Sequence, residues 1–305
     1  GGKRNKIVAI EMIILVLLIM AAVAIFIQRD KSVKEAAKIH NQKAKKTEQT
    51  PQAAQKENEI EEETEGTEEE TGDRDASVPD RSNFAVQPGV SVGTTEQSDE
   101  KIVYLKLDDG PSDYTQAVLD ILDKYTAKAT FFVTGEMSEY KDMIKDAYDK
   151  GHTIGMHTYS HDYAKVYASV DAYFQDLDQI GQMVQEEIGY VPCFIRFPGG
   201  SSNTVSKKYT AGIMSTLVQE VQNRGYQYYD WNGSSGDGSV RTTEELVAQA
   251  TSFDSNNIIL LCHDSHGKQT TVEALPQIIE HYQSLGYTFK ALDRDSFVAH
   301  HGVNN

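Results

Sequence analysis

The chain has 305 residues, of which 25% are charged and 39% hydrophobic, and its formal net charge is −17 at pH 7. This length accommodates one large domain or two ordinary ones, and the acidity, without a basic stripe in the part expected to fold, excludes general nucleic-acid binding. The only two cysteines, Cys193 and Cys262, are too few for a disulfide scaffold and lie in apolar runs, so we expect buried thiols.

The first predicted element is an apolar helix over Ile7–Ile27, which follows a basic tail at residues 1–6. At about 1.5 Å per residue, a helix of this length reaches across the roughly 30 Å hydrocarbon core of a bilayer, so we predict a transmembrane anchor. A cleaved signal peptide is the alternative, since Ala22 and Ala24 suit a cleavage site. However, the apolar run continues beyond them.

Lysine and arginine are frequent directly after this helix, within residues 29–46. By the positive-inside rule, this flank alone favours a cytoplasmic C-terminal domain. The arrangement that we expect, single-pass in the cell membrane with the domain outside the cytoplasm, therefore depends on the function argued below.

Residues 28–98 are predicted to form a disordered acidic linker. The stretch Glu57–Glu70 consists mostly of Glu with some Thr and Gly, so it cannot bury enough apolar surface to offset the entropy of ordering. Repulsion between like charges extends such a linker.

Residues 99–305 are predicted to form one α/β domain, because strand and helix patterns alternate along it. Such a repeat implies a parallel sheet covered by helices, and seven units favour a distorted (β/α) barrel with about seven parallel strands. The expected strands are Ile102–Leu107, Ala129–Val133, Thr153–Met156, Cys193–Phe197, Tyr226–Trp231, Ile258–Cys262 and Tyr287–Phe289. The expected helices are Tyr114–Tyr125, Met137–Lys150, Val170–Ile188, Ser206–Arg224, Thr243–Phe253 and Val272–Leu285.

Polar side chains gather at the carboxyl ends of five of these strands, where barrels of this type carry their chemistry. Each alone has an ordinary explanation: Asp-Asp-Gly-Pro is usually a turn, and a lone histidine is often structural. Their coincidence on one edge favours an active site. The residues are Asp108 and Asp109, His157 and His161, Arg196, Asp237, and His263.

His157 and His161 have a spacing that suits two imidazoles on one cation, and one carboxylate would leave coordination positions open for water and substrate. Zn²⁺ is the first choice, and Fe²⁺ is an alternative on ligand type. A zincin protease would need Glu after the first histidine, where this chain has Thr158. A metal-assisted hydrolase, with Asp108 as base and His263 as acid–base group, accounts for more residues than an Fe(II) oxygenase does.

Over about Lys101 to Leu292, these motifs resemble the polysaccharide deacetylases of carbohydrate esterase family 4, the NodB homology domain. The matching motifs are Asp108-Asp109-Gly110-Pro111, His157-Thr158-Tyr159-Ser160-His161, Arg196-Phe197-Pro198-Gly199-Gly200 and Leu261-Cys262-His263. The chain departs from the family pattern at three places. Lys106-Leu107 replaces Thr-Phe, Gly199 stands where the family often has Tyr, and Gly238 stands in place of a Trp that follows the motif's Asp.

The resemblance implies a role for each matching residue. Asp109, His157 and His161 would hold a divalent metal, with Zn²⁺ expected and Co²⁺, Ni²⁺ or Fe²⁺ possible. Asp108, positioned by Arg196, would be the general base, and His263, oriented by Asp237, would protonate the leaving amine. The backbone N–H of Gly199 would contribute to the oxyanion site, and Leu261 would shape the pocket for the acetyl methyl group.

The expected reaction is hydrolytic removal of N-acetyl groups from a cell-wall glycan, with N-acetylglucosamine of peptidoglycan as the preferred substrate. An anchor followed by a long flexible linker suits an enzyme that reaches an insoluble wall. The expected partners are the acetylated glycan and the membrane, and the sequence indicates no protein partner. Deacetylation of chitin oligomers, exopolysaccharide or O-acetyl xylan, and a non-catalytic glycan-binding protein, are the alternatives.

Overall fold

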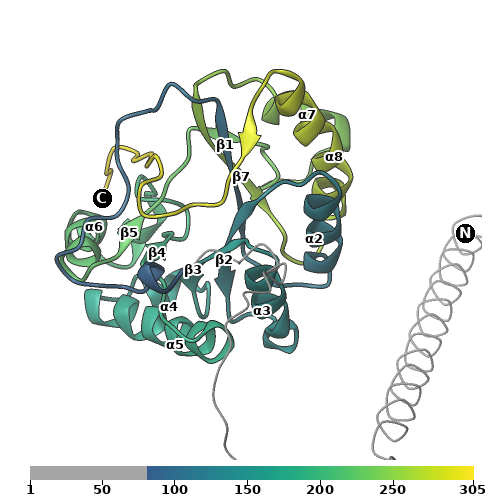
Figure 1. The fold of residues 1–305 in the computed structure, drawn as a ribbon. Coiled ribbons are helices and arrows are strands. Elements are labelled where there is room, and N and C mark those ends of the chain that lie inside the picture. Colours follow the sequence, from purple (N-terminus) through teal and green to yellow (C-terminus); the bar gives the residue numbers. More distant parts are fainter. Residues whose placement is uncertain (1–80) are drawn as a thin grey trace, which may run out of the picture. The chain divides into compact units, whose positions relative to one another are not determined.

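A parallel sheet organises residues 81–305, the part of the chain that the computed structural model describes (Figure 1). The strands lie in the order β5-β4-β3-β2-β1-β7-β6, every neighbouring pair is parallel, and β8 pairs with the first residues of β1. Their bounds are β1 Ile102–Asp108, β2 Ala129–Thr134, β3 Thr153–Thr158, β4 Phe194–Ile195, β5 Gln227–Tyr228, β6 Gly233–Ser234, β7 Asn257–His263 and β8 Thr288–Phe289.

The prediction of an α/β fold with parallel strands is confirmed, but the sheet is a curled half-barrel and not a closed barrel. Within residues 81–305, no pairing joins the two terminal strands β5 and β6. β5 and β6 have only two residues each, as does β4. Strands this short offer too few backbone hydrogen bonds to close the barrel. The long strands β1, β2, β3 and β7 form the continuous part.

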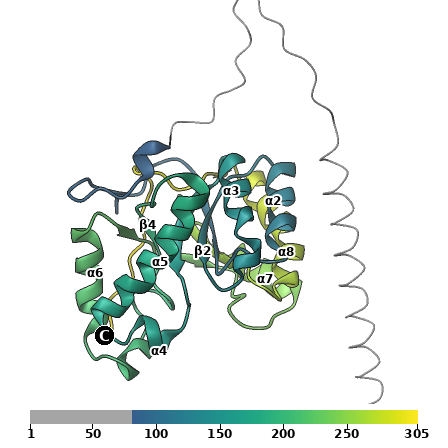
Figure 2. The same cartoon turned by 90° about the horizontal axis from the view of Figure 1, so that it is seen from below.

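Helices surround the strands in both views of the fold (Figures 1 and 2). Two predicted helices are divided: a short 3₁₀ turn η2 precedes α3, and η3 is separated from α6 by Gly212, whose φ of +78° interrupts the helix. The helix α4 and the strand β6 were not predicted, because they are too short to show a period. The bounds are η1 Ser82–Phe84, α2 Thr115–Lys124, η2 Ser138–Tyr140, α3 Asp142–Asp149, α4 Tyr163–Val166, α5 Val170–Ile188, η3 Val205–Lys208, α6 Ile213–Asn223, α7 Thr243–Ala250 and α8 Gln269–Ser284.

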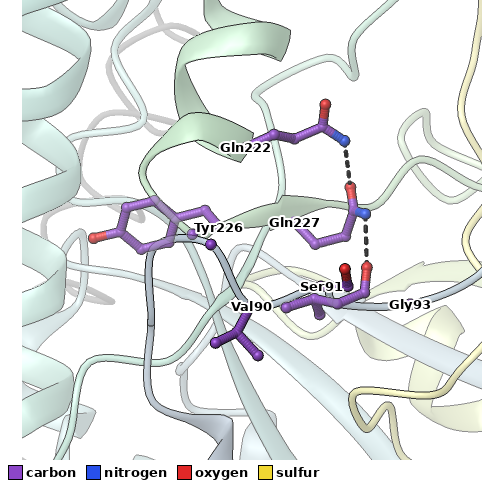
Figure 3. Close-up of a pocket in the computed structure, with 9 residues that line it drawn as sticks. Val90, Ser91, Gly93, Gln222, Tyr226 and Gln227 are labelled. Carbon is purple, nitrogen blue, oxygen red and sulfur yellow. Dashed lines mark hydrogen bonds between the residues drawn. The ribbon is translucent and has the colours of Figure 1, made fainter.

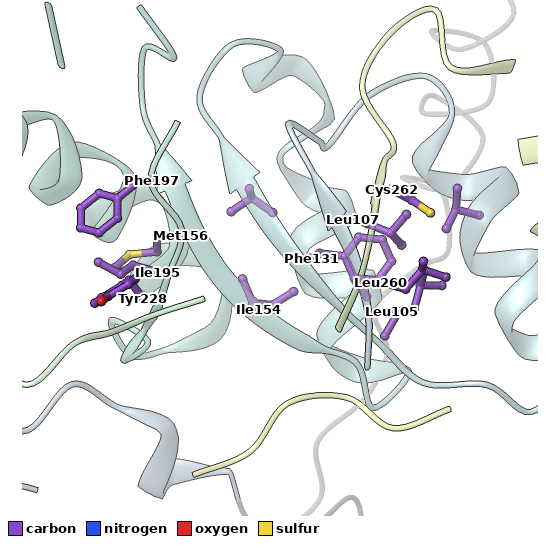
Figure 4. Packing of buried hydrophobic residues seen from close by; sticks show 14 of the residues in the cluster. Leu105, Leu107, Phe131, Ile154, Met156, Ile195, Phe197, Tyr228, Leu260 and Cys262 are labelled. Carbon is purple, nitrogen blue, oxygen red and sulfur yellow. The ribbon is translucent and has the colours of Figure 1, made fainter. Parts of the chain in front are cut away.

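Two apolar clusters cover the two faces of the sheet. Successive side chains of a strand point to opposite faces, so Val103, Leu105 and Leu107 of β1 join the helices in the larger cluster, part of which is seen in Figure 4. Tyr104 lies in the smaller cluster, on the inner face of the curl. Both cysteines are buried free thiols, as expected.

The folded unit extends further toward the N-terminus than the predicted boundary at residue 99. Ala85 forms a β-bridge with Pro192, Thr94 forms one with Phe297, and the Arg81 guanidinium donates to the carbonyl of His152 at 2.6 Å. Residues 81–98 are therefore part of the folded unit and not of the predicted linker, and Phe84 and Val92 pack in the smaller apolar cluster. The predicted membrane helix Ile7–Ile27 and the linker up to residue 80 lie outside the described residues.

No helix within residues 81–305 is both long and apolar enough to cross a membrane.

The buried His152 should make stability depend on pH. Burial lowers its pKa to about 3, and its Nδ1 accepts the Ala129 N–H at 3.2 Å, so the imidazole is neutral in the folded state. Below its ordinary pKa of about 6.5, the unfolded chain binds one more proton than the folded chain. This group should therefore lower the free energy of unfolding by about 1.4 kcal/mol per pH unit as pH falls from 6.5 toward 3.

His152→Asn keeps an acceptor, and urea denaturation should show a smaller loss of stability between pH 7 and pH 5 than in the parent chain. His266→Asn, at an exposed histidine, is the control for the replacement of a histidine by asparagine. Equal slopes for His152→Asn and the parent would contradict the prediction.

Candidate active site and metal centre

The carboxyl end of β1 supplies two adjacent carboxylates to the same site. Asp108 is the last residue of the strand and is fully buried. Asp109 has a φ of +68°, a left-handed conformation that Asp tolerates better than most residues. This turn interrupts the alternation of the strand, so that Asp108 contacts Arg196 while Asp109 contacts the histidines.

Asp109, His157 and His161 are brought together as a ligand set. The Asp109 Oδ1 atom lies 3.2 Å from His157 Nε2 and 3.3 Å from His161 Nε2, and the three ligand atoms lie within 4.8 Å of one another. His157 Nδ1 lies 2.7 Å from the carbonyl oxygen of Arg196; it therefore carries the proton and leaves the Nε2 lone pair directed at Asp109. The buried Asp109 Oδ1 has no hydrogen-bond donor among residues 81–305. Two imidazoles and one carboxylate with these lone pairs converging fit a divalent metal.

The loop that joins the two histidines is held by Asp176 of α5, which the sequence analysis missed. Its carboxylate accepts the backbone N–H of Tyr159 at 2.6 Å and the N–H of Ser160 at 3.2 Å. Asp176 lies on the buried stripe of α5, beside Leu177 and close to Tyr173 in sequence. An acidic residue at a buried helical position was the signal that could have identified it.

Asp264, which follows His263 at the end of β7, supports the loop after β1, a role that the sequence did not indicate. The Thr115 hydroxyl donates to its Oδ2 at 2.6 Å, and its backbone N–H donates to the Asp108 carbonyl at 3.2 Å. A Cβ at Gly110 would lie 2.4 Å from both Asp264 carboxylate oxygens, so the loop needs glycine there. Burial raises the pKa of Asp264 to about 7.

Asp108 and Arg196 form a buried ion pair through Asp108 Oδ2 and Arg196 Nε. Burial raises the pKa of Asp108, but the charges of Arg196 and Lys106 outweigh it and hold this pKa below its ordinary value. The other carboxylate oxygen, Oδ1, is buried and has no partner among the described residues. An ionised carboxylate with one oxygen anchored and one free can accept a proton.

Asp237 and His263 form the second acid–base pair. His263 Nδ1 lies 2.8 Å from Asp237 Oδ1, while Asp237 Oδ2 accepts the His263 backbone N–H and the Thr271 hydroxyl, each at 2.8 Å. Burial lowers the pKa of His263, but the hydrogen bond and charge of Asp237 outweigh it and raise the pKa above its ordinary value. His263 Nε2 lies 3.8 Å from Asp109 Oδ2, so this pair faces the ligand set.

Leu261 and Gly199 are the remaining predicted site residues. In the register of β1 and β7, Asp108 is opposite His263 and Lys106 is opposite Leu261, which places Leu261 on the inner face just below the acid–base groups. The backbone N–H of Gly199 has no acceptor in the described part of the chain. It is therefore free to donate to a ligand.

Tyr163 is an aromatic residue of the site that the sequence analysis missed. Its ring lies 6.0 Å from that of His161, and its hydroxyl would be 2.8 Å from a Cβ at Gly199. The absent side chain at Gly199 thus makes room for Tyr163. By contrast, no atom lies within 4 Å of a Cβ built at Gly238, so that position forms no wall.

Asp230, which precedes the only tryptophan of the chain, is structural. Its carboxylate accepts the N–H and hydroxyl of Ser201 and the N–H of His301.

A separate cavity of about 380 Å³ lies at the opposite end of β5, where Gln227 is hydrogen-bonded to Gln222 and to the Val92 carbonyl (Figure 3). It contains none of the catalytic candidates.

Comparisons with known proteins agree with this geometry. The sequence profile of the family "Polysaccharide deacetylase" matches residues 95–218. The crystal structure of the catalytic domain of a peptidoglycan N-acetylglucosamine deacetylase from Eubacterium rectale is 46% identical, with a TM-score of 0.67. The similarity covers 69% of this chain and 97% of that one.

Two curated proteins extend the comparison. A peptidoglycan-N-acetylglucosamine deacetylase from Bacillus cereus is 30% identical over 197 residues, which are 63% of this chain and 86% of the relative. A chitin deacetylase from Arthroderma benhamiae is 36% identical over 182 residues, covering 57% of this chain and 46% of the relative.

The two adjacent carboxylates should differ in metal binding. Calorimetric titration with Zn²⁺ should show that Asp109→Asn weakens affinity by more than the roughly 10- to 100-fold typical of an outer-shell change. Asp108→Asn, which removes a charge one residue away, should change the affinity less, because Asp108 contacts Arg196 and not the histidines. Equal losses in both variants would contradict the separation of roles.

Asp237→Asn should lower kcat on an acetylated glycan by about 10²- to 10⁴-fold, because the amide cannot hold His263 in the same protonation state. Thr271→Val is the matched control: it removes one hydrogen bond to Asp237 and leaves the Asp237–His263 contact in place. Its kcat should stay within about tenfold of the parent. A similar fall in both variants would show that Asp237 acts only through local packing.

Proposed function

The chain belongs to the polysaccharide deacetylase family, and from this premise we propose that its substrate is the N-acetylglucosamine of peptidoglycan. The enzyme is a hydrolase of acetylated polysaccharide. The convergence of the Asp109 ligand set, the Asp108–Arg196 pair and the Asp237–His263 pair on one rim supports the reaction. The observation that carries the substrate proposal is the 46% identity to the catalytic domain of a peptidoglycan N-acetylglucosamine deacetylase.

In the proposed reaction, water adds to the acetyl carbonyl, the C–N bond breaks, and acetate and a free amine leave. Asp109, His157 and His161 would hold the divalent metal, for which we propose Zn²⁺. When bound, the metal supplies Lewis-acid activation of the amide carbonyl.

Asp108 is the proposed general base. Its free Oδ1 takes a proton from the attacking water, and Arg196 holds the other oxygen in place. The backbone N–H of Gly199 is the proposed donor to the oxyanion that forms at the acetyl carbonyl. Donors that are already oriented contribute because they need no rearrangement during the reaction.

His263 is the proposed general acid. It gives the proton on Nε2 to the departing amine nitrogen, while Asp237 holds Nδ1 and stabilises the charged imidazole. Leu261, below this pair on the inner face, is proposed to contact the acetyl methyl group.

We further propose that the enzyme acts outside the cytoplasm while tethered to the membrane. The apolar segment Ile7–Ile27 supports the tether, and the Glu-rich stretch Glu57–Glu70 farther along the chain supports an extended spacer. The placement outside the cytoplasm follows from the proposed substrate, which lies in the cell wall.

The full chain should release acetate from peptidoglycan and from N-acetylglucosamine oligomers in the presence of Zn²⁺. A chelator should abolish release, and added Zn²⁺ should restore it. Asp108→Asn should reduce release by about 10²- to 10⁴-fold while still binding metal, because it removes only the base.

Release from chitin oligomers or O-acetyl xylan, without release from peptidoglycan, would replace the proposed substrate with another acetylated polymer. The similarity to a chitin deacetylase makes chitin oligomers the first comparison. Binding to glycan without any release, with metal bound, would contradict catalysis altogether.

A further inference from the structure

A lysine lies buried directly beneath the acid–base groups, on the inner face of the sheet. Lys106 of β1 is two residues before Asp108, points to the same face, and is fully buried. Its neighbours in the sheet register are Thr130 on β2 and Leu261 on β7. Its charge contributes to keeping Asp108 ionised, but the mechanism above gives it no positioning role.

The ammonium group reaches across the interior to the chain between β5 and β6. Lys106 Nζ donates to the carbonyls of Tyr229 and Asp230, each at 3.2 Å, and lies 5.1 Å from the ring centre of Phe132 and 5.9 Å from that of Trp231. It therefore joins the central strand to residues 229–232, the β5–β6 connection, at the place where the sheet is open.

This buried cation has no direct carboxylate partner among residues 81–305. The charged groups that face it are Asp108 on its own strand, Arg196 after β4 and Asp230 in the β5–β6 connection. Burial lowers the pKa of Lys106 to about 7. A neutral side chain of the same length would avoid the desolvation cost of a charge. The presence of a lysine at this buried position therefore needs an explanation.

Trp231 connects this lysine to the proposed base. The Arg196 guanidinium carbon lies 4.4 Å from the centre of the Trp231 ring, and Arg196 holds Asp108. Trp231 is also held by its backbone, since its carbonyl oxygen lies 2.6 Å from His301 Nε2. One chain of contacts therefore runs from Lys106 through the β5–β6 connection and the Trp231 indole to the Arg196 guanidinium and the Asp108 carboxylate.

We propose that Lys106 is a positioning residue for deacetylation: its ammonium fixes the β5–β6 connection, so that Trp231 supports Arg196 against Asp108. The inference rests on the proposed roles of Arg196 and Asp108. Small displacements of catalytic groups are costly in rate, so loss of this support acts on kcat and not on glycan affinity.

Lys106→Met tests the proposal, because methionine fills the space without charge or donors. Its kcat should fall by about 10- to 100-fold with KM changed by less than about threefold. Trp231 is the only tryptophan, so its fluorescence reports on the connection directly; the emission should shift to longer wavelength and become easier to quench with acrylamide. Circular dichroism and thermal unfolding verify that the variant is folded.

Three further variants separate this role from simple packing. Lys145→Met removes an exposed lysine on α3 and should change neither kcat nor emission. Trp231→Leu should lower kcat, and the double variant Lys106→Met/Trp231→Leu should lose no more than the worse single variant, because both break one chain of contacts. Lys106→Gln keeps one donor group, so its kcat should lie between those of the parent and Lys106→Met. This variant replaces Lys106→Met in the test if the methionine variant does not fold.

A double variant whose loss of kcat is the product of the two single losses would overturn the proposal. A folded Lys106→Met enzyme with parental kcat, or with unchanged emission, would also overturn it. A parent chain that releases no acetate would contradict the proposed function instead, and the emission comparison would still decide whether Lys106 holds the connection.

Discussion

The contact between Asp108 and Arg196 joins the central strand β1 to the short strand β4 side of the sheet inside the protein. Both side chains are buried, so their charges must be compensated by each other and by the groups around them. The carbonyl of Arg196 also receives the Nδ1 proton of His157. The ion pair therefore keeps the proposed base ionised, while the backbone carbonyl of the same arginine sets the tautomer of His157.

Around this pair, the environment divides chemically identical carboxylates among different tasks. Asp109 is turned out of the strand by its left-handed backbone and faces two imidazoles, whereas Asp237 accepts from His263 and Thr271. Asp176 and Asp230 accept backbone N–H groups and hold loops. The difference arises from which donors each carboxylate meets, because the side chains themselves are the same.

The three departures from the family pattern do not have the same consequence. At Gly199 the missing side chain is filled by Tyr163, and the backbone N–H stays free. At Gly238 no atom lies within 4 Å of a Cβ, so the surrounding space is open. Lys106 introduces a buried charge next to the base, where burial and Arg196 together weaken its hold on a proton.

The sequence alone determined the α/β class, most strand positions, the buried cysteines and the polar motifs at the strand ends, because strand periods and ordered polar motifs are local signals. It did not determine the open side of the sheet, the short elements α4 and β6, or the packing of residues 81–98, which depend on contacts between distant segments. Asp176, Tyr163 and the role of Asp264 were missed for the same reason: each contacts a different segment of the chain. Only tertiary structure decides which buried polar groups meet, since each must find a partner wherever the fold brings one.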